Sequence, residues 1–213
     1  MLRIYHVPLT RSVRLVWLCE ALGLEYEKVP IDFSPEYRAS SEWRKLNPIG
    51  KVPALTDGDF SMFESGAMMQ YILQRYADGR LQPAPDSSDY ARFLQWCWFA
   101  EATHSRPIGE IVNHRRALAE TDQSAAAIKD MRWRSEQCVA VLDDELARHR
   151  FIVGDEFTAA DIMTGYSLLL AERFAPQQLP DCVARYREDL RSTPGYEAAT
   201  SDITMPPAAI EPN

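Results

Sequence analysis

The sequence LRIYHVPLTRSVRLVWLCEALGLEYEKVPID, residues 2–32, predicts the first three elements of the fold. Residues 2–7 read as a short strand, and residues 12–23 place apolar side chains at helical spacing up to Gly23, a typical helix stop. Residues 25–32 then alternate polar and apolar side chains, which indicates a second strand. A strand, a helix and a strand in this order pair the two strands in parallel.

The residues that follow add two more strands. Residues 33–50 are loop-like, with prolines, serines and Gly50. Residues 52–57 and 60–64 are short apolar runs on either side of an Asp-Gly pair, a strong hairpin signal. A helix is predicted over 64–77. The residue pattern therefore predicts a small four-stranded mixed sheet with helices over residues 1–80.

The second part of the chain has a different character. A linker is predicted at residues 81–88, where two prolines interrupt any periodicity, and residues 89–213 are predicted to form an all-α domain. The predicted helices span 89–119, 124–150, 158–174 and 180–192. At the start of the third, Thr158-Ala-Ala-Asp161 has the spacing of a capping box. The tail at 203–213 carries three prolines and is expected to hang loosely or to pack as a strap.

Composition narrows the function classes. The chain has 213 residues, with 23 Lys and Arg against 31 Asp and Glu, so the net charge is −8. An acidic surface repels phosphate backbones and argues against nucleic-acid binding. The longest apolar runs are too short for a membrane span, and the start of the chain lacks a signal sequence. The four cysteines lack zinc spacing and read as buried thiols, so no metal and a cytoplasmic location are expected.

The turn after the first strand is the first of three segments that suit chemistry. In open α/β folds ligands sit beyond the carboxyl ends of strands. Thr10 and Ser12 place hydroxyl groups there, just before a helix N-terminus with its positive potential. The structural alternative is that Ser12 simply caps the helix.

The other two segments suit a peptide and an anion. Lys51 precedes Val52-Pro53 at a strand start, where a proline leaves the backbone of its neighbour outside the ladder. With a cis Val52–Pro53 bond, the Val52 backbone would pair with an extended peptide; otherwise Pro53 merely ends a loop. Glu64 and Ser65 begin a helix, where a hydroxyl and free N–H groups bind anions; simple capping by Ser65 is the alternative.

Taken together, these segments resemble the cytosolic glutathione transferases, in particular bacterial members. The resemblance covers nearly the whole chain and is carried by RIYHVPLTRSVRLVWLCEALGLEYE (3–27), LNPIGKVPAL (46–55), ESGAMMQYI (64–72), WCWFAEAT (96–103) and FIVGDEFTAADI (151–162). It implies a thioredoxin-like N-terminal domain, β-α-β-α-β-β-α, followed by an all-α helical bundle. It also implies glutathione as co-substrate and a homodimer.

The resemblance also implies roles for individual residues. Val52, beside cis-Pro53, would pair with the cysteinyl part of glutathione. Glu64 and Ser65 would hold its γ-glutamyl end. Lys51 would meet the glycyl carboxylate.

The sequence offers three candidates for the residue that activates the thiol. The family uses a Tyr, Ser or Cys near the end of the first strand, and Thr10 stands where many bacterial members carry Ser. Thr10 therefore ranks first, Ser12 second and Tyr5 third, and Arg11 would add its N–H or its charge. The turn contains no cysteine, which argues against mixed-disulfide chemistry.

The implied activity is conjugation of the glutathione thiolate to a small hydrophobic electrophile. The helical domain would line the electrophile pocket, with Glu101 and His104 as candidate contacts one helical turn apart; for His104 a surface or core position is the structural alternative. Two further hypotheses stay open. One is glutathione-dependent peroxide or disulfide reduction, or isomerisation, at the same site. The other is a binding or regulatory protein without turnover.

Overall fold

The computed structural model describes residues 1–204. It divides into two compact units, one of residues 1–82 with 191–204 and one of residues 83–190. We call these the sheet unit and the helical unit. The division differs from the segmentation expected from the sequence in that residues 191–204 belong to the sheet unit. From residue 205 onward, the predicted proline-rich tail lies outside the described residues.

The sheet unit contains the predicted four-stranded mixed sheet. Its strands are β1 (Leu2–His6), β2 (Tyr26–Pro30), β3 (Ala54–Asp57) and β4 (Phe60–Met62). Their order is β2-β1-β3-β4, with β1 parallel to β2 and antiparallel to β3. The Asp-Gly hairpin joins β3 to β4, which pair antiparallel, so the predicted turn is confirmed.

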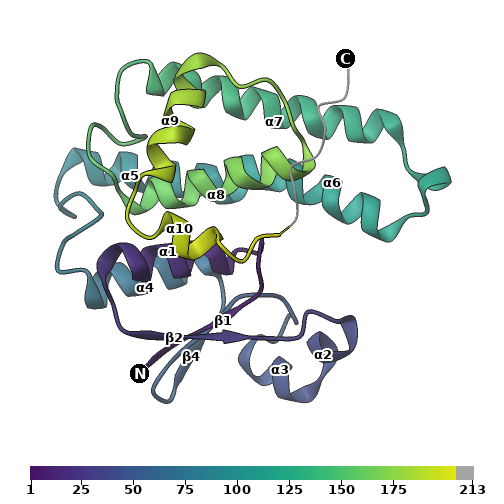
Figure 1. Cartoon of the computed structure of the whole chain (residues 1–213), viewed down its shortest axis with the longest axis horizontal. Helices are drawn as coiled ribbons and strands as arrows, with labels where there is room; N and C mark the ends of the chain where they lie inside the picture. Colours follow the sequence, from purple (N-terminus) through teal and green to yellow (C-terminus); the bar gives the residue numbers. More distant parts are fainter. Residues whose placement is uncertain (205–213) are drawn as a thin grey trace. The chain divides into compact units, whose positions relative to one another are not determined.

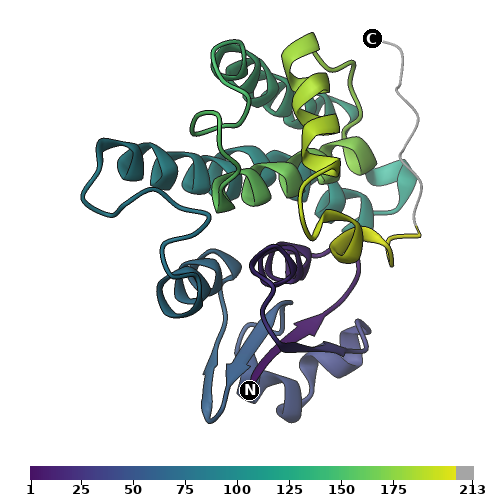
Figure 2. The same ribbon diagram turned by 60° about the vertical axis from the view of Figure 1, so that its left-hand side comes forward.

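Helices cover both faces of this sheet. The helices α1 (Ser12–Leu22) and α4 (Ser65–Tyr76) lie on one face, and the short helices α2 (Pro35–Ala39) and α3 (Ser41–Leu46) lie on the other (Figures 1 and 2). The prediction of a loop at 33–50 was therefore wrong, whereas the helix implied there by the family resemblance is confirmed. The hydroxyls of Ser34 and Ser40 accept N–H bonds at the starts of α2 and α3, and such capping stabilises even short helices.

Strand β1 sends its side chains to the two faces in alternation. Leu2, Ile4 and His6 are buried on one face, while Tyr5 points to the other. There the Tyr5 ring meets that of Trp43, the buried residue of α3, edge to face at 5.8 Å. His6 and Tyr5 are thus separated by the sheet although they are neighbours in the chain.

The last described segment of the chain returns to α1. The indole N–H of Trp17 donates to the Pro194 carbonyl over 3.1 Å, and its ring packs against Tyr196 at the start of α10 (Tyr196–Thr200). Between them Gly195 has a φ of 83°, and a Cβ there would lie 2.8 Å from the Trp17 carbonyl oxygen. This close approach requires glycine, and it holds the segment that begins at Pro194 against α1.

The helical unit consists of packed helices, as predicted. They are α5 (Ser88–Trp98), α6 (Ser105–Ala117), α7 (Ala125–Leu146), α8 (Ala159–Phe174) and α9 (Asp181–Arg191). The continuous helix predicted over 89–119 is instead interrupted by a π-helical segment, Phe99–His104 (η1), and a 3₁₀ turn, Glu120–Asp122, follows α6. Helix α8 is buried along most of its length because α5, η1 and α6 surround it.

The predicted capping box at the start of α8 is confirmed. Thr158 and Asp161 exchange hydrogen bonds, and the Asp161 carboxylate is completely buried. It also accepts from the Ile152 N–H and the Tyr186 hydroxyl, each over 2.8 Å. Burial raises the pKa of Asp161 to about 6, although these hydrogen bonds lower it.

Some broad expectations can be compared with the described part of the chain. No helix within residues 1–204 is both long and apolar enough to span a bilayer. None of the four cysteines forms a disulfide. Burial raises the pKa of Cys19 to about 12 and that of Cys138 to about 11. Cys97 and Cys182 are partly exposed, so the expectation of four buried thiols was wrong for these two.

Candidate functional site

Three separate segments of the sheet unit meet at one edge of the sheet. Strand β3 runs antiparallel to β1 and pairs Ala54 with Tyr5, so the residues before β3 lie beside the turn that follows β1. On the helical face, the Arg14 guanidinium of α1 donates to the Ser65 hydroxyl at the start of α4 over 3.4 Å. The register and this bond bring together the three segments that the sequence singles out.

The turn after β1 holds the Thr10 hydroxyl at the sheet edge. The Thr10 N–H and hydroxyl both donate to the Val7 carbonyl, over 3.2 and 2.8 Å, and Leu9 between them has a φ of 61°. The Thr10 hydroxyl also lies 2.8 Å from that of Ser12. Thr10 is partly exposed, so its hydroxyl lies between the solvent and the buried groups behind it.

Ser12 does not cap α1, which corrects the structural alternative considered for it. The N-cap position belongs to Arg11, and no side chain caps this end. The completely buried Ser12 hydroxyl lies 2.8 Å from His6 Nδ1 and 3.1 Å from the Val7 carbonyl, and it accepts the Val7 N–H over 3.3 Å. The other His6 nitrogen, Nε2, lies 3.0 Å from the Asp202 carboxylate.

The charges around His6 come from two other segments. Asp202 follows α10 and also pairs with the Lys28 ammonium of β2 over 3.1 Å. Burial lowers the pKa of His6, the Asp202 carboxylate acts to raise it, and Lys28 lowers it further. Nothing local in the sequence identifies His6 or Asp202 as site residues, because they are 196 positions apart.

The segment before β3 leaves backbone groups without partners. The Val52–Pro53 peptide bond is cis. Within residues 1–204 neither the N–H nor the carbonyl of Val52 has a hydrogen-bond partner, and Lys51 beside it is exposed. The buried Asn47 amide donates to the Pro53 carbonyl over 3.0 Å and holds this segment in place. Sequence reasoning missed Asn47, although an asparagine next to Pro-x-Gly is a recognisable turn residue.

Ser65 is the first residue of α4 and is buried, and Glu64 occupies the N-cap position without a side-chain cap. Glu64 has a φ of 75°, which is unusual for a residue other than glycine, and it is exposed. Arg14, completely buried, places a permanent positive charge against Ser65. Sequence reasoning missed Arg14 too; its signal is one arginine inside an otherwise apolar helix face.

The remaining predicted residues lie elsewhere. Tyr5 packs on Trp43 on the sheet face opposite to His6. In the helical unit, Glu101 and His104 belong to η1. Glu101 is partly exposed, whereas His104 has no exposed surface, and burial alone lowers its pKa to about 4. A direct contact between His104 and a substrate would require η1 to rearrange.

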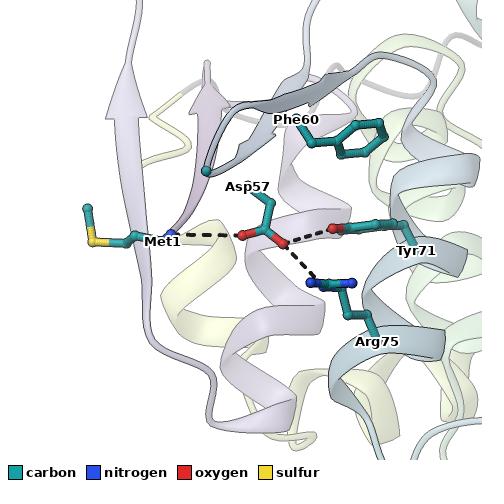
Figure 3. Close-up of a pocket in the computed structure, with 6 residues that line it drawn as sticks. Met1, Asp57, Phe60, Tyr71 and Arg75 are labelled. Carbon is teal, nitrogen blue, oxygen red and sulfur yellow. Dashed lines mark hydrogen bonds and ion pairs between the residues drawn. The ribbon is translucent and has the colours of Figure 1, made fainter.

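Two surface pockets each lie within one unit. In the sheet unit, a pocket of about 530 Å³ surrounds Asp57, which binds the N-terminus, Arg75 and Tyr71 (Figure 3). In the helical unit, a pocket of about 410 Å³ is lined by Phe99, Trp133 and Cys138 among others. None of the predicted site residues lines either pocket. Among residues 1–204 no cluster of His, Cys, Asp and Glu is arranged to hold a metal ion.

The sheet edge therefore offers a recognisable set of groups. A partly exposed hydroxyl, a backbone without partners and a buried cation near a helix N-terminus suit a short peptide that carries a carboxylate. Because Arg14 remains charged at any physiological pH, it favours an anionic group at Ser65.

Comparison with known proteins gives a consistent picture. The family model described as the N-terminal domain of glutathione S-transferase matches residues 1–74. Glutathione S-transferase 3 from Zea mays is 30% identical over 97% of this chain and 96% of its own length.

Two solved structures show the same fold. A glutathione transferase from Burkholderia graminis, solved with two glutathione molecules per subunit, superimposes with a TM-score of 0.85 at 23% identity, over 95% of this chain and 88% of its own. URE2P6 from Phanerochaete chrysosporium, solved with oxidized glutathione, gives 0.84 at 24% identity, over 94% and 95%. With the two-unit architecture and the sheet edge described above, these likenesses show that the chain belongs to the glutathione S-transferase family.

Proposed function

We propose that this protein binds glutathione at the sheet edge and adds the glutathione thiolate to a small hydrophobic electrophile. The partly exposed Thr10 hydroxyl, at the same edge as the unpartnered Val52 backbone, is the observation that supports this most directly. A thiol paired in register at Val52 would lie next to the segment that holds Thr10.

Each part of glutathione has a suitable group. Val52 offers an N–H and a carbonyl to the cysteinyl residue, as a strand edge does to an added strand. The γ-glutamyl carboxylate would bind at Ser65, where Arg14 and the start of α4 provide positive potential. Glu64, exposed beside Ser65, suits the γ-glutamyl ammonium, and exposed Lys51 suits the glycyl carboxylate. Arg11, at the N-cap of α1, would add positive charge near the bound thiol.

The chemistry needs the thiolate. A thiol with a pKa of about 8.5 is only a few per cent ionised at pH 7. Lowering that pKa by about two units requires about 2.7 kcal/mol of selective stabilisation of the thiolate. A hydrogen bond from Thr10, together with the N-terminus of α1, is of this size. The proposal gives Tyr5 no part in activation, because its ring packs on Trp43 on the sheet face opposite to His6.

Ultraviolet absorbance of the thiolate during glutathione titrations across pH tests the proposal. We expect a bound thiolate well below pH 8 and formation of a conjugate with a chlorodinitrobenzene. Thr10→Ala should remove most of the thiolate absorbance but retain binding, whereas Tyr5→Phe should leave both unchanged. Saturable binding without thiolate would favour reduction, isomerisation or a binding role. Absence of binding would refute the proposal.

Assembly and location complete the proposal. We infer that the protein acts as a homodimer in the cytoplasm, as members of this family typically do. Sedimentation analysis at micromolar concentration checks the dimer, and a single species of 24.3 kDa would contradict it.

A further inference from the structure

A continuous row of polar groups leads from the sheet edge into the sheet unit. The Thr10 hydroxyl lies 2.8 Å from the Ser12 hydroxyl, which lies 2.8 Å from His6 Nδ1, and His6 Nε2 lies 3.0 Å from the Asp202 carboxylate. We call these four residues the His6 array. Only Thr10 and Asp202 are partly exposed; Ser12 and His6 are buried.

Hydrogen-bond chemistry sets the direction of the array. An ionised carboxylate can only accept, so Nε2 of His6 carries the hydrogen that points to Asp202. In neutral His6 the other nitrogen, Nδ1, is then an acceptor. Ser12 donates to it, and the Ser12 oxygen is left to accept from Thr10. The Thr10 hydrogen has a second acceptor in the Val7 carbonyl, also at 2.8 Å, so a rotation of the hydroxyl selects between the two.

From this geometry we propose that His6 receives, through Ser12 and Thr10, the proton displaced when the glutathione thiol ionises, and that Asp202 holds the imidazolium so formed. This inference rests on the proposed function. His6 does not touch the sulfur; it is a positioning residue that acts through the two hydroxyls.

The proton balance of the step is simple. The S–H bond breaks as the Thr10 oxygen takes the thiol proton. Thr10 passes its own hydroxyl proton to Ser12, and Ser12 passes its own to His6 Nδ1. Sulfur keeps the electron pair as thiolate and now accepts a hydrogen bond from Thr10. The negative charge thus moves to sulfur and a positive charge appears on His6, while the net charge of the complex does not change.

The surroundings of His6 act on its protonation in both directions. Burial lowers the pKa of His6, which keeps the imidazole neutral before glutathione binds and opposes the imidazolium unless a negative charge stabilises it. The charged groups that act on His6 are the Asp202 carboxylate, which favours the imidazolium, and the Lys28 ammonium, which opposes it. The ion pair between Asp202 and His6 therefore becomes stronger once His6 is protonated.

The decisive measurement follows the proton at pH 7. Reduced glutathione is added to ¹⁵N-histidine-labelled protein, while ultraviolet absorbance reports the thiolate and a pH indicator in weak buffer reports protons released. We expect the His6 nitrogens to take imidazolium shifts, with fewer protons released than thiolates formed. S-methylglutathione, which has no thiol proton, should leave His6 neutral.

The possible outcomes distinguish failure of the proton relay through His6 from failure of the proposed function. A thiolate that forms with His6 still neutral and one proton released for each thiolate overturns the relay and leaves the proposed function intact. Absence of a bound thiolate overturns both. The His6 signals are assigned by their loss in the folded His6→Asn variant. If that variant does not fold, the thiol pKa and the proton release of the Ser12→Ala variant, described below, test the relay instead.

Two small substitutions interrupt the array without removing Thr10. Ser12→Ala should raise the pKa of the bound glutathione thiol by about one unit or more, and the thiol proton should then be released to solvent. Asp202→Asn should raise that pKa in the same direction. Glu27→Gln is the matched control, because it also changes a carboxylate paired with a cation of the sheet unit, Arg3, but lies outside the array. Equal pKa values in the wild type and both array variants would refute the relay.

Discussion

The two units each contain a buried titratable group within a hydrogen-bond network, but the two networks end differently. In the helical unit Asp161 is surrounded by donors from Ile152, Thr158 and Tyr186, and every bond points at the carboxylate. In the sheet unit the bonds of His6 lead on through Ser12 to the partly exposed Thr10. A network that closes on itself stabilises a helix start; one that reaches the surface can exchange a proton with a ligand.

The largest expected effect comes from breaking the closed network. Asp161→Ala leaves the N–H groups of Ile152 and Thr158 and two hydroxyls without their acceptor, and should destabilise the protein by more than about 3 kcal/mol. Urea unfolding followed by circular dichroism measures this. Asp130→Ala, at an exposed ion pair of the same unit, should cost less than about 1 kcal/mol. Equal losses would show that the Asp161 network adds nothing beyond a surface pair.

How far the sequence predicts these networks depends on the distance between partners along the chain. The capping box is predictable because Thr158 and Asp161 are three residues apart, whereas the bond from Tyr186 crosses 25 residues. Sequence reasoning singles out Thr10, Val52 and Ser65 as candidate site residues because turns and helix starts have local signals. Asp202 has no such signal toward His6, because residues 194–202 are brought there by long-range contacts, among them the Trp17 indole bond to the Pro194 carbonyl and the packing of Trp17 on Tyr196.

The same reasoning explains the errors in the fold. The strands and the first helix follow from local periodicity and turn residues, as does Gly23, whose φ of 65° ends α1. The two short helices at 35–46 were missed, although Ser34 and Ser40 are local capping signals. The π-helical interruption at Phe99–His104 has no comparable signal, because the apolar pattern runs through it; it accompanies the burial of His104 against neighbouring helices.

His104 offers a second way to sharpen the comparison, because it is buried and neither of its ring nitrogens has a hydrogen-bond partner among residues 1–204. Its pKa of about 4 lies below the unfolded value of 6.5, so the unfolded state binds more protons between these values and stability falls as pH falls. His104→Leu should remove this loss. At pH 4.5 the variant should be more stable than the wild type by about 2–3 kcal/mol, and at pH 7.5 by much less.

Asp161 makes this pH profile diagnostic. Its raised pKa of about 6 means that the folded state binds more protons between the unfolded value of 3.8 and 6, so this group makes stability rise as pH falls. His104 opposes it in the wild type, and His6, Asp57 and Glu110, whose pKa values are also lowered in the folded state, act in the same direction as His104. In His104→Leu, urea midpoints should therefore fall less steeply than in the wild type on acidification from pH 6.5 to 4.5. A midpoint that falls as steeply as in the wild type would contradict the assigned role of His104.

A smaller effect is expected from Arg14, which is two residues after Ser12 in α1 but outside the His6 array. We expect it to act on ligand binding rather than on proton transfer. Arg14→Met removes the buried cation that contacts Ser65 and should weaken glutathione binding by about tenfold or more. The thiol pKa of the glutathione that still binds should change little, because Thr10, Ser12 and His6 are unchanged in this variant. Calorimetric titration measures the affinity, with Arg3→Met, at an exposed ion pair of β1, as control. A raised thiol pKa at unchanged affinity would place Arg14 in proton transfer instead.

The smallest effect is expected at the exposed end of the open network. Thr10→Ser keeps the hydroxyl that bonds Ser12 and the Val7 carbonyl but removes the methyl group, which restricts the side-chain rotamer. The serine hydroxyl samples more rotamers, so the thiolate fraction at pH 7 should change by less than about threefold, because freeing one side-chain torsion is worth only a fraction of a kcal/mol. Thr10→Val, which keeps the shape and removes the hydroxyl, should lose most of the thiolate. If Thr10→Ser instead falls to the level of Thr10→Val, the methyl group rather than the hydrogen bond positions the sulfur, and the open network would not begin at the Thr10 oxygen.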